Sequence, residues 1–278
     1  MSERVLIAGC GNVGNALATR LLAEGCEVWG VRRNISALAE GIQPWRVDLT
    51  DPASLRSPPT PFDYVFYTAS ADRRDESSYR AIYVDGLRDL LQTLEAAGSP
   101  LKRVFFTSST AVYGQQSGEW VDEQSATEPA RFNGHILLEA EAIVRASGSG
   151  VVVRLSGIYG PGRTRLIEKV WNEEAEATQS WTNRIHVEDC GAVLYHLMRI
   201  EAPADVYIGS DDEPTTTAET VTWMSKQLGV ATPAAVAATR ANKRCHNTLL
   251  RSTGYRFIYS SFREGYTPII EDFLRNRP

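Results

Sequence analysis

Val5-Leu6-Ile7-Ala8-Gly9-Cys10-Gly11-Asn12-Val13-Gly14 is the stretch that decides the fold. Residues 4–8 form an apolar run that predicts a buried β-strand, and residues 13–24 carry a helical pattern. Between them, Gly9 permits a tight turn, Gly11 lets a phosphate approach the backbone, and Gly14 lets helix and strand pack closely. Because a helix N-terminus offers free N–H groups to an anion, the stretch predicts a dinucleotide phosphate cradle. A purely structural glycine turn is the alternative.

Short apolar runs then alternate with longer helical patterns through the first part of the chain. Continuous rather than alternating apolar runs suit strands that are covered on both faces. The strands are expected at residues 4–8, 27–31, 44–47, 64–67, 103–106 and 151–155, and a long helix is expected at 76–97. This alternation predicts an α/β fold with a parallel sheet and right-handed crossovers. Further on, the pattern predicts helices at 163–178, 187–200, 217–228 and 261–276 and a strand at 204–208.

The composition excludes several classes of protein. The 278 residues are 43% hydrophobic and 23% charged, which is typical of a globular chain. A formal net charge of -5 argues against a dedicated nucleic-acid binder. The four cysteines form no Cys-x-x-Cys pair, so we expect no structural zinc and reduced thiols.

Targeting signals are also missing from the sequence. The apolar run near the N-terminus is short and leads directly into glycines, unlike a signal peptide. No stretch reaches the roughly 18 apolar residues of a membrane span. We therefore expect a cytoplasmic protein without a membrane partner.

The end of the second predicted strand bears on the choice of cofactor. An NAD site usually carries an acidic residue there to hold the ribose 2′-hydroxyl. This strand instead ends in Arg32 and Arg33, and a guanidinium suits a phosphate. The sequence therefore favours NADP as the cofactor, with NAD as the alternative. If the two arginines do not bind a phosphate, they are solvated surface charges or stack on the adenine.

An acidic residue follows the third predicted strand. Asp48 can accept a hydrogen bond from an adenine amino group while Leu49 packs on the ring. The alternative for Asp48 is a helix N-cap. Asp51, which precedes Pro52, is the better cap, so Asp48 is left for the adenine.

Several motifs taken together resemble one family. They comprise the glycine loop, Val47-Asp48-Leu49, Tyr67-Thr68-Ala69-Ser70-Ala71, Thr107-Ser108-Ser109-Thr110-Ala111-Val112-Tyr113-Gly114, Arg154-Leu155-Ser156-Gly157-Ile158-Tyr159-Gly160-Pro161-Gly162, Asn183-Arg184-Ile185-His186-Val187-Glu188-Asp189 and Tyr207-Ile208-Gly209-Ser210-Asp211-Asp212-Glu213-Pro214. The chain resembles an extended short-chain dehydrogenase/reductase of the NAD-dependent epimerase/dehydratase type, in its atypical (YeeZ-like) branch. The similarity runs nearly end to end, although Ala8 stands where extended members usually carry the first glycine.

The resemblance implies a doubly wound Rossmann sheet with a small C-terminal α/β subdomain. Residues 1–160, with 183–208, would form the NAD(P)-binding domain, and residues 161–278 the substrate-binding subdomain. The cofactor-binding positions would be Gly9, Gly11, Asn12, Val13, Gly14, Arg32, Arg33, Asp48, Leu49, Thr68, Ala69 and Ser70. The family also implies a catalytic Ser/Thr, Tyr and Lys, in which lysine lowers the pKa of a proton-shuttling tyrosine.

The catalytic set is incomplete in this sequence. Ser109 matches the family serine and can hydrogen-bond a substrate oxygen, or else it caps a turn. The Tyr-x-x-x-Lys pair is missing from residues 131–141. Anchoring Glu141 to the family's glutamate puts Asn133 and Leu137 at these positions, whereas anchoring Glu139 gives Arg131 and His135. The first register is preferred, because Leu137–Leu138 suits a helix that packs on a sheet.

Three side chains are candidates to replace the missing proton relay. They are Tyr113, His135 and His186. The alternatives are that Tyr113 packs in the interior, that His135 faces solvent and that His186 orders a loop. None of them is firmly assigned as the general base.

Polar residues further along the chain fall in segments that approach substrate in relatives. Arg163, Arg165, Asn183 and Arg184 match these segments, as does His186; the alternative for the arginines is pairing with nearby acidic residues. The stretch 242–247 is expected to fold back over the cleft. No metal site is expected.

Two functions remain open from the sequence. One is an NAD(P)-dependent oxidoreductase or epimerase-like enzyme for a small hydroxyl- or carbonyl-bearing metabolite or a sugar nucleotide. The other is a non-catalytic NAD(P)-binding sensor or scaffold, which the missing tyrosine and lysine favour. Relatives are often homodimers, and the helices at 76–97 and 128–147 are candidates for such an interface.

Overall fold

The computed structural model describes residues 2–238 and 242–276 and divides the chain into two compact units. The first unit comprises Met1–Val112, Pro129–Arg154 and Cys190–Tyr207, and the second comprises Tyr113–Glu128, Leu155–Asp189 and Ile208–Pro278. Residues 113–128, 155–160, 183–189 and 208, which the family resemblance assigns to the NAD(P)-binding domain, therefore group with the second unit.

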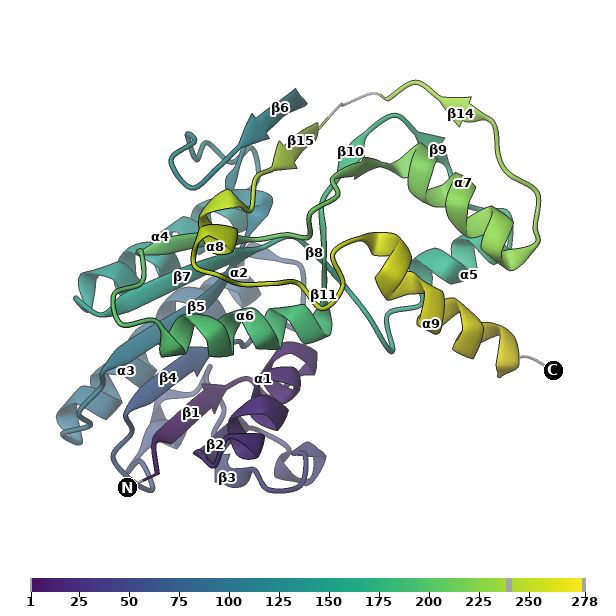
Figure 1. Ribbon diagram of the computed structural model, residues 1–278. Helices are drawn as coiled ribbons and strands as arrows, with labels where there is room; N and C mark the ends of the chain where they lie inside the picture. Colours follow the sequence, from purple (N-terminus) through teal and green to yellow (C-terminus); the bar gives the residue numbers. More distant parts are fainter. Residues whose placement is uncertain (1, 239–241, 277–278) are drawn as a thin grey trace. The chain divides into compact units, whose positions relative to one another are not determined.

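A seven-stranded sheet forms the centre of the first unit, in the order β12-β7-β5-β4-β1-β2-β3 (Figure 1). The strands are β1 (Arg4–Ala8), β2 (Glu27–Arg32), β3 (Gln43–Arg46), β4 (Tyr64–Tyr67), β5 (Arg103–Ser109), β7 (Gly150–Leu155) and β12 (Val206–Gly209). The first strand pairs in parallel with β2 on one side and β4 on the other. The order of strands thus reverses at β1, as in a doubly wound α/β sheet, and this confirms the predicted fold class.

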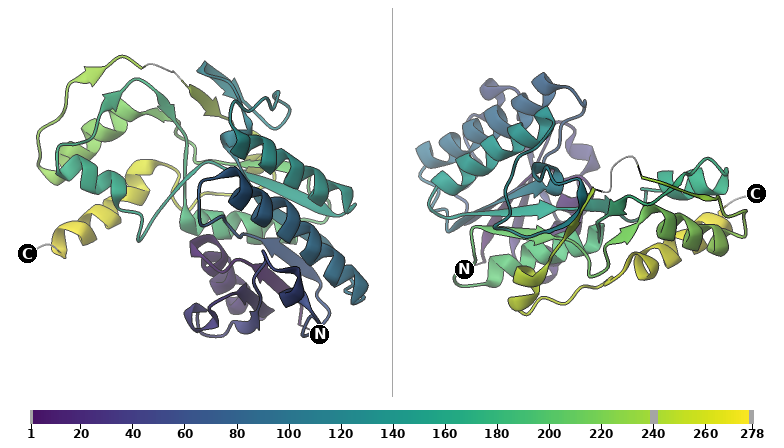
Figure 2. Two further views of the ribbon diagram at one scale, coloured as in Figure 1. Left: turned by 180° about the vertical axis from the view of Figure 1, so that it is seen from behind. Right: turned by 90° about the horizontal axis from the view of Figure 1, so that it is seen from above.

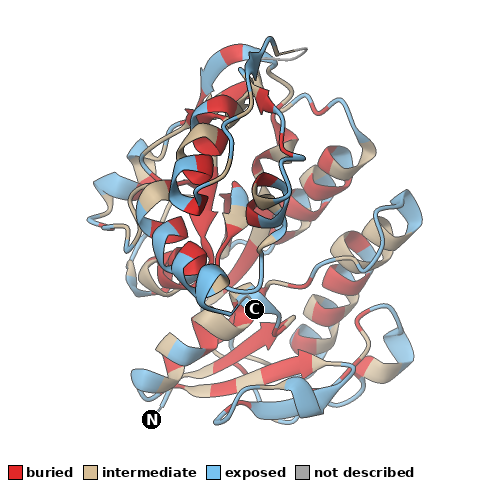
Figure 3. Cartoon of the chain, turned by 90° about the vertical axis from the view of Figure 1, so that its right-hand side faces the viewer, coloured by how far each residue is buried: buried red, intermediate tan, exposed pale blue. Residues whose placement is uncertain are grey.

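Helices cover both faces of this sheet (Figure 2). They are α1 (Asn12–Ala23) and α6 (Val187–Arg199) on one face, and α3 (Gly86–Ala96) and α4 (Phe132–Ala146) on the other. The central strands are buried while the helices alternate between buried and exposed sides (Figure 3). Continuous apolar runs such as residues 5–8 are explained by this double cover. No helix in the described residues is long and apolar enough to cross a membrane.

The long helix expected at 76–97 is interrupted by a π-helical turn. It consists of α2 (Glu76–Arg80), a π-helical segment (Ala81–Asp85) and then α3. Tyr67 on β4 donates its hydroxyl to the carbonyl of Ile82, and a Cβ at Gly86 would lie 2.3 Å from the carbonyl oxygen of Leu49. The helix is therefore tied to β4 through Tyr67 and runs very close to the segment that follows β3, and such π turns are frequent at functional sites.

A buried ion pair fixes α4 on the sheet. The fully buried carboxylate of Glu141 accepts hydrogen bonds from Nη2 of Arg154 on β7 at 2.7 Å and from Oγ of Ser108 on β5 at 2.6 Å. Breaking a buried pair of this kind leaves an uncompensated charge, which is strongly destabilising. The pair thus sets which side of α4 faces the interior.

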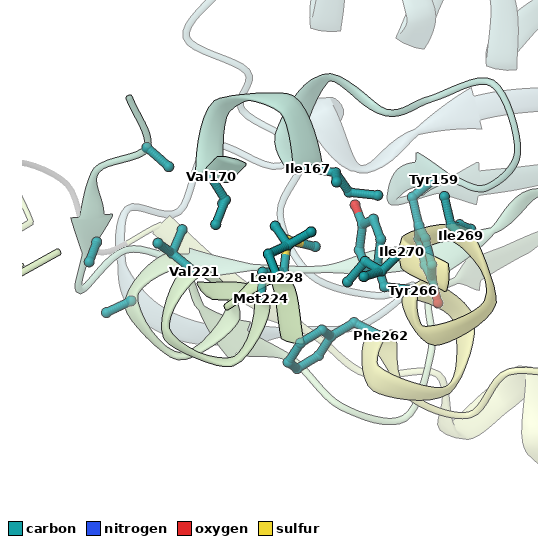
Figure 4. Packing of buried hydrophobic residues seen from close by; sticks show 13 residues of the cluster. Tyr159, Ile167, Val170, Val221, Met224, Leu228, Phe262, Tyr266, Ile269 and Ile270 are labelled. Atoms are coloured by element: carbon teal, nitrogen blue, oxygen red, sulfur yellow. The ribbon is translucent and has the colours of Figure 1, made fainter. Parts of the chain in front are cut away.

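The second unit has its own apolar core (Figure 4). It is enclosed by α5 (Arg165–Trp171), α7 (Thr217–Leu228) and α9 (Phe262–Arg275), with β8 (Gly157–Tyr159) pairing with β11 (Arg184–His186). A capping box of Thr216 and Glu219 starts α7. The helix expected over 163–178 ends at Trp171, because the backbone turns left-handed at Glu173 and residues 177–178 form a short strand.

Several short elements complete the two units. They are the 3₁₀ turns Ile35–Ala37, Pro52–Leu55 and Thr110–Val112, the strands β6 (Ser117–Val121), β9 (Ala177–Thr178), β10 (Trp181–Thr182), β13 (Thr215–Thr216), β14 (Ala235–Val236) and β15 (Asn242–Cys245), and α8 (Thr248–Ser252). The carboxylate of Asp51 accepts the N–H of Ala53 at the start of the second turn, which confirms Asp51 as a cap.

Two buried aspartates of the second unit have opposite surroundings. Asp189 accepts hydrogen bonds from the hydroxyl of Tyr255 at 2.6 Å and from the N–H groups of Ile258 and Tyr259. Asp211 is only 1% exposed, and its Oδ2 has no hydrogen-bond partner among the described residues. Burial therefore raises the pKa of Asp211 to about 8, although the charge of Arg184 acts in the other direction.

The Asp211 carboxyl should make stability depend on pH. Its pKa is raised above the unfolded value of 3.8, so the folded chain holds the proton more tightly and the free energy of unfolding falls as pH rises from about 4 to 8. Asp211→Asn mimics the neutral acid and should lose less melting temperature between pH 5 and pH 8 than the parent chain. Asp272→Asn, an exposed change on α9, is the control. Equal losses in parent and D211N would contradict this explanation.

Candidate functional site

A cavity of about 660 Å³ opens in the first unit where β1, β2 and β4 end. The carboxyl ends of strands beside the reversal of strand order are where open α/β sheets bind ligands. Nine of the twelve predicted cofactor-binding residues line it: Gly9, Gly11, Arg32, Arg33, Asp48, Leu49, Thr68, Ala69 and Ser70. Asn12, Val13 and Gly14 form the first turn of α1 behind the lining. The volume is in the usual range for a small-molecule site.

The three glycines of the turn have different environments. A Cβ at Gly9, whose φ is +101°, would lie 2.4 Å from the Cα of Ala69, and one at Gly14 would lie 2.5 Å from the carbonyl oxygen of Gly9. A Cβ at Gly11 would meet no atom within 4 Å. Gly9 and Gly14 are therefore required for packing, whereas Gly11 leaves open space in the cavity wall.

The start of α1 provides hydrogen-bond donors at this opening. Gly11 is the N-cap residue, and in the described part of the chain no side chain caps the helix. The first N–H groups of a helix lack intrahelical acceptors and lie at its positive end. The arrangement suits an anion, as the glycine spacing predicts.

The two arginines at the end of β2 make different contacts. Nη1 of Arg32 donates to the carbonyl oxygens of Cys10, at 2.9 Å, and Ala37, at 3.1 Å, which ties β2 to the glycine turn. Nη2 of Arg33 lies 2.6 Å from Oδ2 of Asp72, and both side chains are exposed. Arg33 is thus the arginine whose charge reaches solvent at the cavity.

The hydrogen bonding and the pKa of the Asp48 carboxylate depend on the nearby Thr50. Its Oδ1 accepts the N–H of Thr50 at 3.0 Å and the Thr50 hydroxyl at 2.7 Å, and Oδ2 accepts no hydrogen bond from the described residues. Partial burial raises the pKa of Asp48, but the Thr50 hydrogen bonds and the charge of Arg33 outweigh it and hold the pKa below its ordinary value. Asp48 is therefore an ionised acceptor in the cavity lining.

The predicted catalytic residues have different local surroundings. Ser109 ends β5 in the first unit, where its Oγ accepts the N–H of Ala111 at 3.1 Å. Tyr113 belongs to the second unit and is buried, with its hydroxyl donating to the carbonyl oxygen of Asp122 at 2.8 Å. His135 is exposed on α4. The geometry supports a turn-capping role for Ser109, whose hydroxyl donates to no acceptor in the part of the chain that the structure describes.

Helix α4 carries neither tyrosine nor lysine, and its burial pattern bears on the choice of register. Glu141 is buried in the ion pair with Arg154, whereas Glu139 is exposed and pairs with Arg80. This contrast is in keeping with the preferred register, in which Glu141 is the anchor and Asn133 and Leu137 are expected at the family's tyrosine and lysine positions. Leu137 is only 4% exposed.

The predicted substrate-binding residues of the second unit are mostly committed to internal contacts. Arg184 donates to the hydroxyls of Thr182 and Thr215. His186 accepts the N–H of Glu188 at Nδ1, and burial lowers its pKa, so the ring is neutral.

Asn183 and Arg163 differ from this pair. The side-chain amide of Asn183 holds the backbone of β15, donating to the carbonyl oxygen of Lys243 and accepting the N–H of Cys245. Arg163 and Arg165 are exposed next to and within α5. Only these two arginines point to solvent in this set.

Some cavity residues were not anticipated. Asp72, Arg73, Ser77, Ser78, Ala81 and Ile82 also line the cavity, and they belong to the segment that follows β4. Nothing in the local sequence pattern marks them, because they reach the cavity through the path of the chain after β4. No group of three or more metal-ligating side chains occurs within residues 2–238 and 242–276.

Comparison with known proteins agrees with this geometry. The family model "NAD dependent epimerase/dehydratase family" matches residues 5–209. Protein YeeZ of Escherichia coli (strain K12) is 28% identical over 250 residues, 83% of this chain and 86% of YeeZ. A dTDP-6-deoxy-L-talose 4-dehydrogenase (NAD(P)(+)) of Kitasatospora kifunensis is 32% identical over 170 residues, 57% of this chain and 53% of that enzyme.

A solved structure matches almost the whole chain. It is that of a Methylobacillus flagellatus protein assigned to the NAD-dependent epimerases/dehydratases, with a TM-score of 0.87 and 37% identity. The match covers 99% of this chain and 100% of that one. The family model and this structural match lead to one conclusion: the chain belongs to the NAD-dependent epimerase/dehydratase family.

Proposed function

We propose that the chain is an NADP-preferring oxidoreductase or epimerase-like enzyme that acts on a small hydroxyl- or carbonyl-bearing metabolite or a sugar nucleotide. The observation that carries the proposal is the open wall at Gly11, set in the cavity of about 660 Å³ beside the uncapped start of α1. A bound nicotinamide would supply hydride transfer. The related Kitasatospora kifunensis enzyme, by its name, uses NAD(P)(+) in a dehydrogenase reaction.

Each part of the cofactor has a residue suited to it. The N–H groups of α1 would hold the pyrophosphate, and the free Oδ2 of Asp48 would accept the adenine amino group. Arg33 would bind the 2′-phosphate, since no acidic residue ends β2 and a guanidinium pairs well with phosphate. Ser109 would orient the reacting oxygen of the substrate.

A second function, a non-catalytic NAD(P)-binding sensor or scaffold, is favoured by one observation. At the position that the family resemblance gives to the lysine, α4 carries the buried, apolar Leu137. An apolar side chain cannot stabilise a tyrosinate or hold a nicotinamide ribose. In this alternative the cavity binds the dinucleotide without turnover.

Dinucleotide binding can be separated from folding by two glycine substitutions. Gly11→Ala places a methyl group in open space, so it should leave the melting temperature unchanged while weakening NADPH binding at least about tenfold, because the methyl group occupies the phosphate approach. Gly14→Ala drives a methyl group against the backbone of Gly9 and should lower the melting temperature. Calorimetry with NADPH and thermal unfolding measure both effects. Unchanged NADPH affinity in G11A would rule out this pocket.

The preference for NADP depends on Arg33. Arg33→Gln should weaken NADP binding about tenfold, the usual weight of a hydrogen bond to a charged group, and leave NAD binding unchanged. Asp72→Asn should act in the opposite direction, because it removes the carboxylate that competes with the phosphate for Arg33. Calorimetry with both cofactors checks this. Tighter binding of NAD than NADP by the parent chain would refute the preference.

Turnover distinguishes the enzyme from the sensor. NADPH oxidation is measured against panels of carbonyl compounds and sugar nucleotides, and Ser109→Ala should reduce the rate on the order of 100-fold, as for other lost donors to a reacting oxygen. Ser147→Ala at the end of α4 is the control. A chain that binds NADPH but oxidises it with no member of either panel would support the sensor.

A further inference from the structure

Lys243 is an unusual lysine for this chain. The chain has four lysines, of which Lys102, Lys169 and Lys226 are exposed, while Lys243 in the second unit is only 9% exposed. Among the described residues, its ammonium forms no ion pair and donates no hydrogen bond. Its Nζ is not among the fully buried polar atoms that lack a hydrogen-bond partner, so the side-chain stem is packed while the ammonium keeps some contact with solvent. A partly desolvated charge without a partner costs stability, so its presence requires an explanation other than folding.

The strand that carries Lys243 is held in place from its backbone. The amide of Asn183 donates to the carbonyl oxygen of Lys243 at 2.9 Å and accepts the N–H of Cys245 at 2.7 Å. Asn242 has a left-handed backbone, with φ of +58°, and its side chain donates to the carbonyl oxygen of Trp181 at 2.9 Å. These contacts hold the backbone of β15 on both sides of Lys243, at the point where its pairing with β6 is irregular.

The neighbouring side chain is fixed as well. Nε of Arg244 donates to the carbonyl oxygen of Gly118 at 2.8 Å, and its guanidinium carbon lies 4.8 Å from the ring centres of both Trp120 and Trp181. Burial alternates along β15, where Lys243 and Cys245 are buried and Arg244 is half-buried, although the pairing with β6 is irregular between Asn242 and Arg244. One basic residue is thus engaged with aromatic rings while the other is left unpaired.

Within residues 2–238 and 242–276, no acidic side chain forms an ion pair with the Lys243 ammonium. Burial lowers the pKa of the Lys243 ammonium. Burial raises the pKa of Cys245 to about 12, with smaller effects of Lys243 and Glu123, so the thiol is neutral at physiological pH. A positively charged side chain that lacks an ion-pair partner and is held on a fixed strand is typical of a site that binds an anionic ligand.

We propose that Lys243 binds an oxyanion of the substrate, a phosphate or a carboxylate oxygen, and that Asn183, Asn242 and Arg244 are positioning residues for it. An ammonium is a compact point charge suited to either group. The inference rests on the proposed function, because it assigns an anionic substrate to that enzyme. Its test does not depend on the cofactor or on turnover.

Thermal unfolding of the parent chain and Lys243→Met tests the proposal. Methionine keeps the apolar stem and removes the charge, so K243M should melt at least about 2 °C higher without added anions. Sodium phosphate or sodium malonate, compared with sodium chloride at equal ionic strength, should raise the melting temperature of the parent chain, and this rise should be lost in K243M. Phosphate and malonate distinguish the two oxyanion classes. Lys226→Met, an exposed change on α7, should alter neither quantity.

Three results would overturn the proposal: a lower melting temperature for K243M, an anion-dependent rise that K243M retains, or no such rise in the parent chain. NADPH calorimetry on K243M keeps the two proposals apart. Its NADPH affinity should equal that of the parent chain, since the dinucleotide cavity is lined by residues of the first unit. Failure of the parent chain to bind NADPH would refute the proposed function and leave the Lys243 result intact.

Discussion

The close approach of the β1 turn to β4 is the constraint on which the first unit depends. At Gly9 the two backbones leave no room for a side chain, and Thr68 donates its hydroxyl to the carbonyl oxygen of Gly9 at 2.7 Å. This contact sets where α1 begins and on which side Gly11 opens. Arg32 ties β2 to the same turn. Three strands therefore converge on one short segment, and the cavity is the space that they leave.

Charge is distributed according to a simple rule in this molecule. Where a carboxylate serves the fold, its partners are complete, as for Glu141 between Arg154 and Ser108 and for Asp189 with its three donors. Among the described residues, two buried charged side chains of the second unit have incomplete partners: Oδ2 of Asp211 accepts no hydrogen bond, and the Lys243 ammonium forms no ion pair. Incomplete partners lower stability, and natural proteins tolerate such losses mainly where function needs them.

Local pattern in the sequence sufficed for the sheet, the glycine turn, the cap at Asp51 and helix α7, because each depends on residues close together in the chain. It did not suffice for the π turn beside Gly86, the early end of α5 or the contact between Arg33 and Asp72. Those features depend on contacts between residues that are far apart in the sequence. The amide of Asn183 is the clearest case: its residue type suits substrate binding, yet its partners are sixty residues away on β15.

The order of strands also has a consequence for synthesis of the protein. The sheet needs β12 at its edge, and β6 pairs with β15, which comes near the end of the chain. During translation, the edge of β7 that pairs with β12 therefore stays unpaired until residue 209 has emerged from the ribosome. The edge of β6 stays unpaired until residue 245 has emerged. Unpaired edges are prone to aggregate. A nascent chain of this topology gains from fast elongation or from a chaperone that covers those edges in the interval.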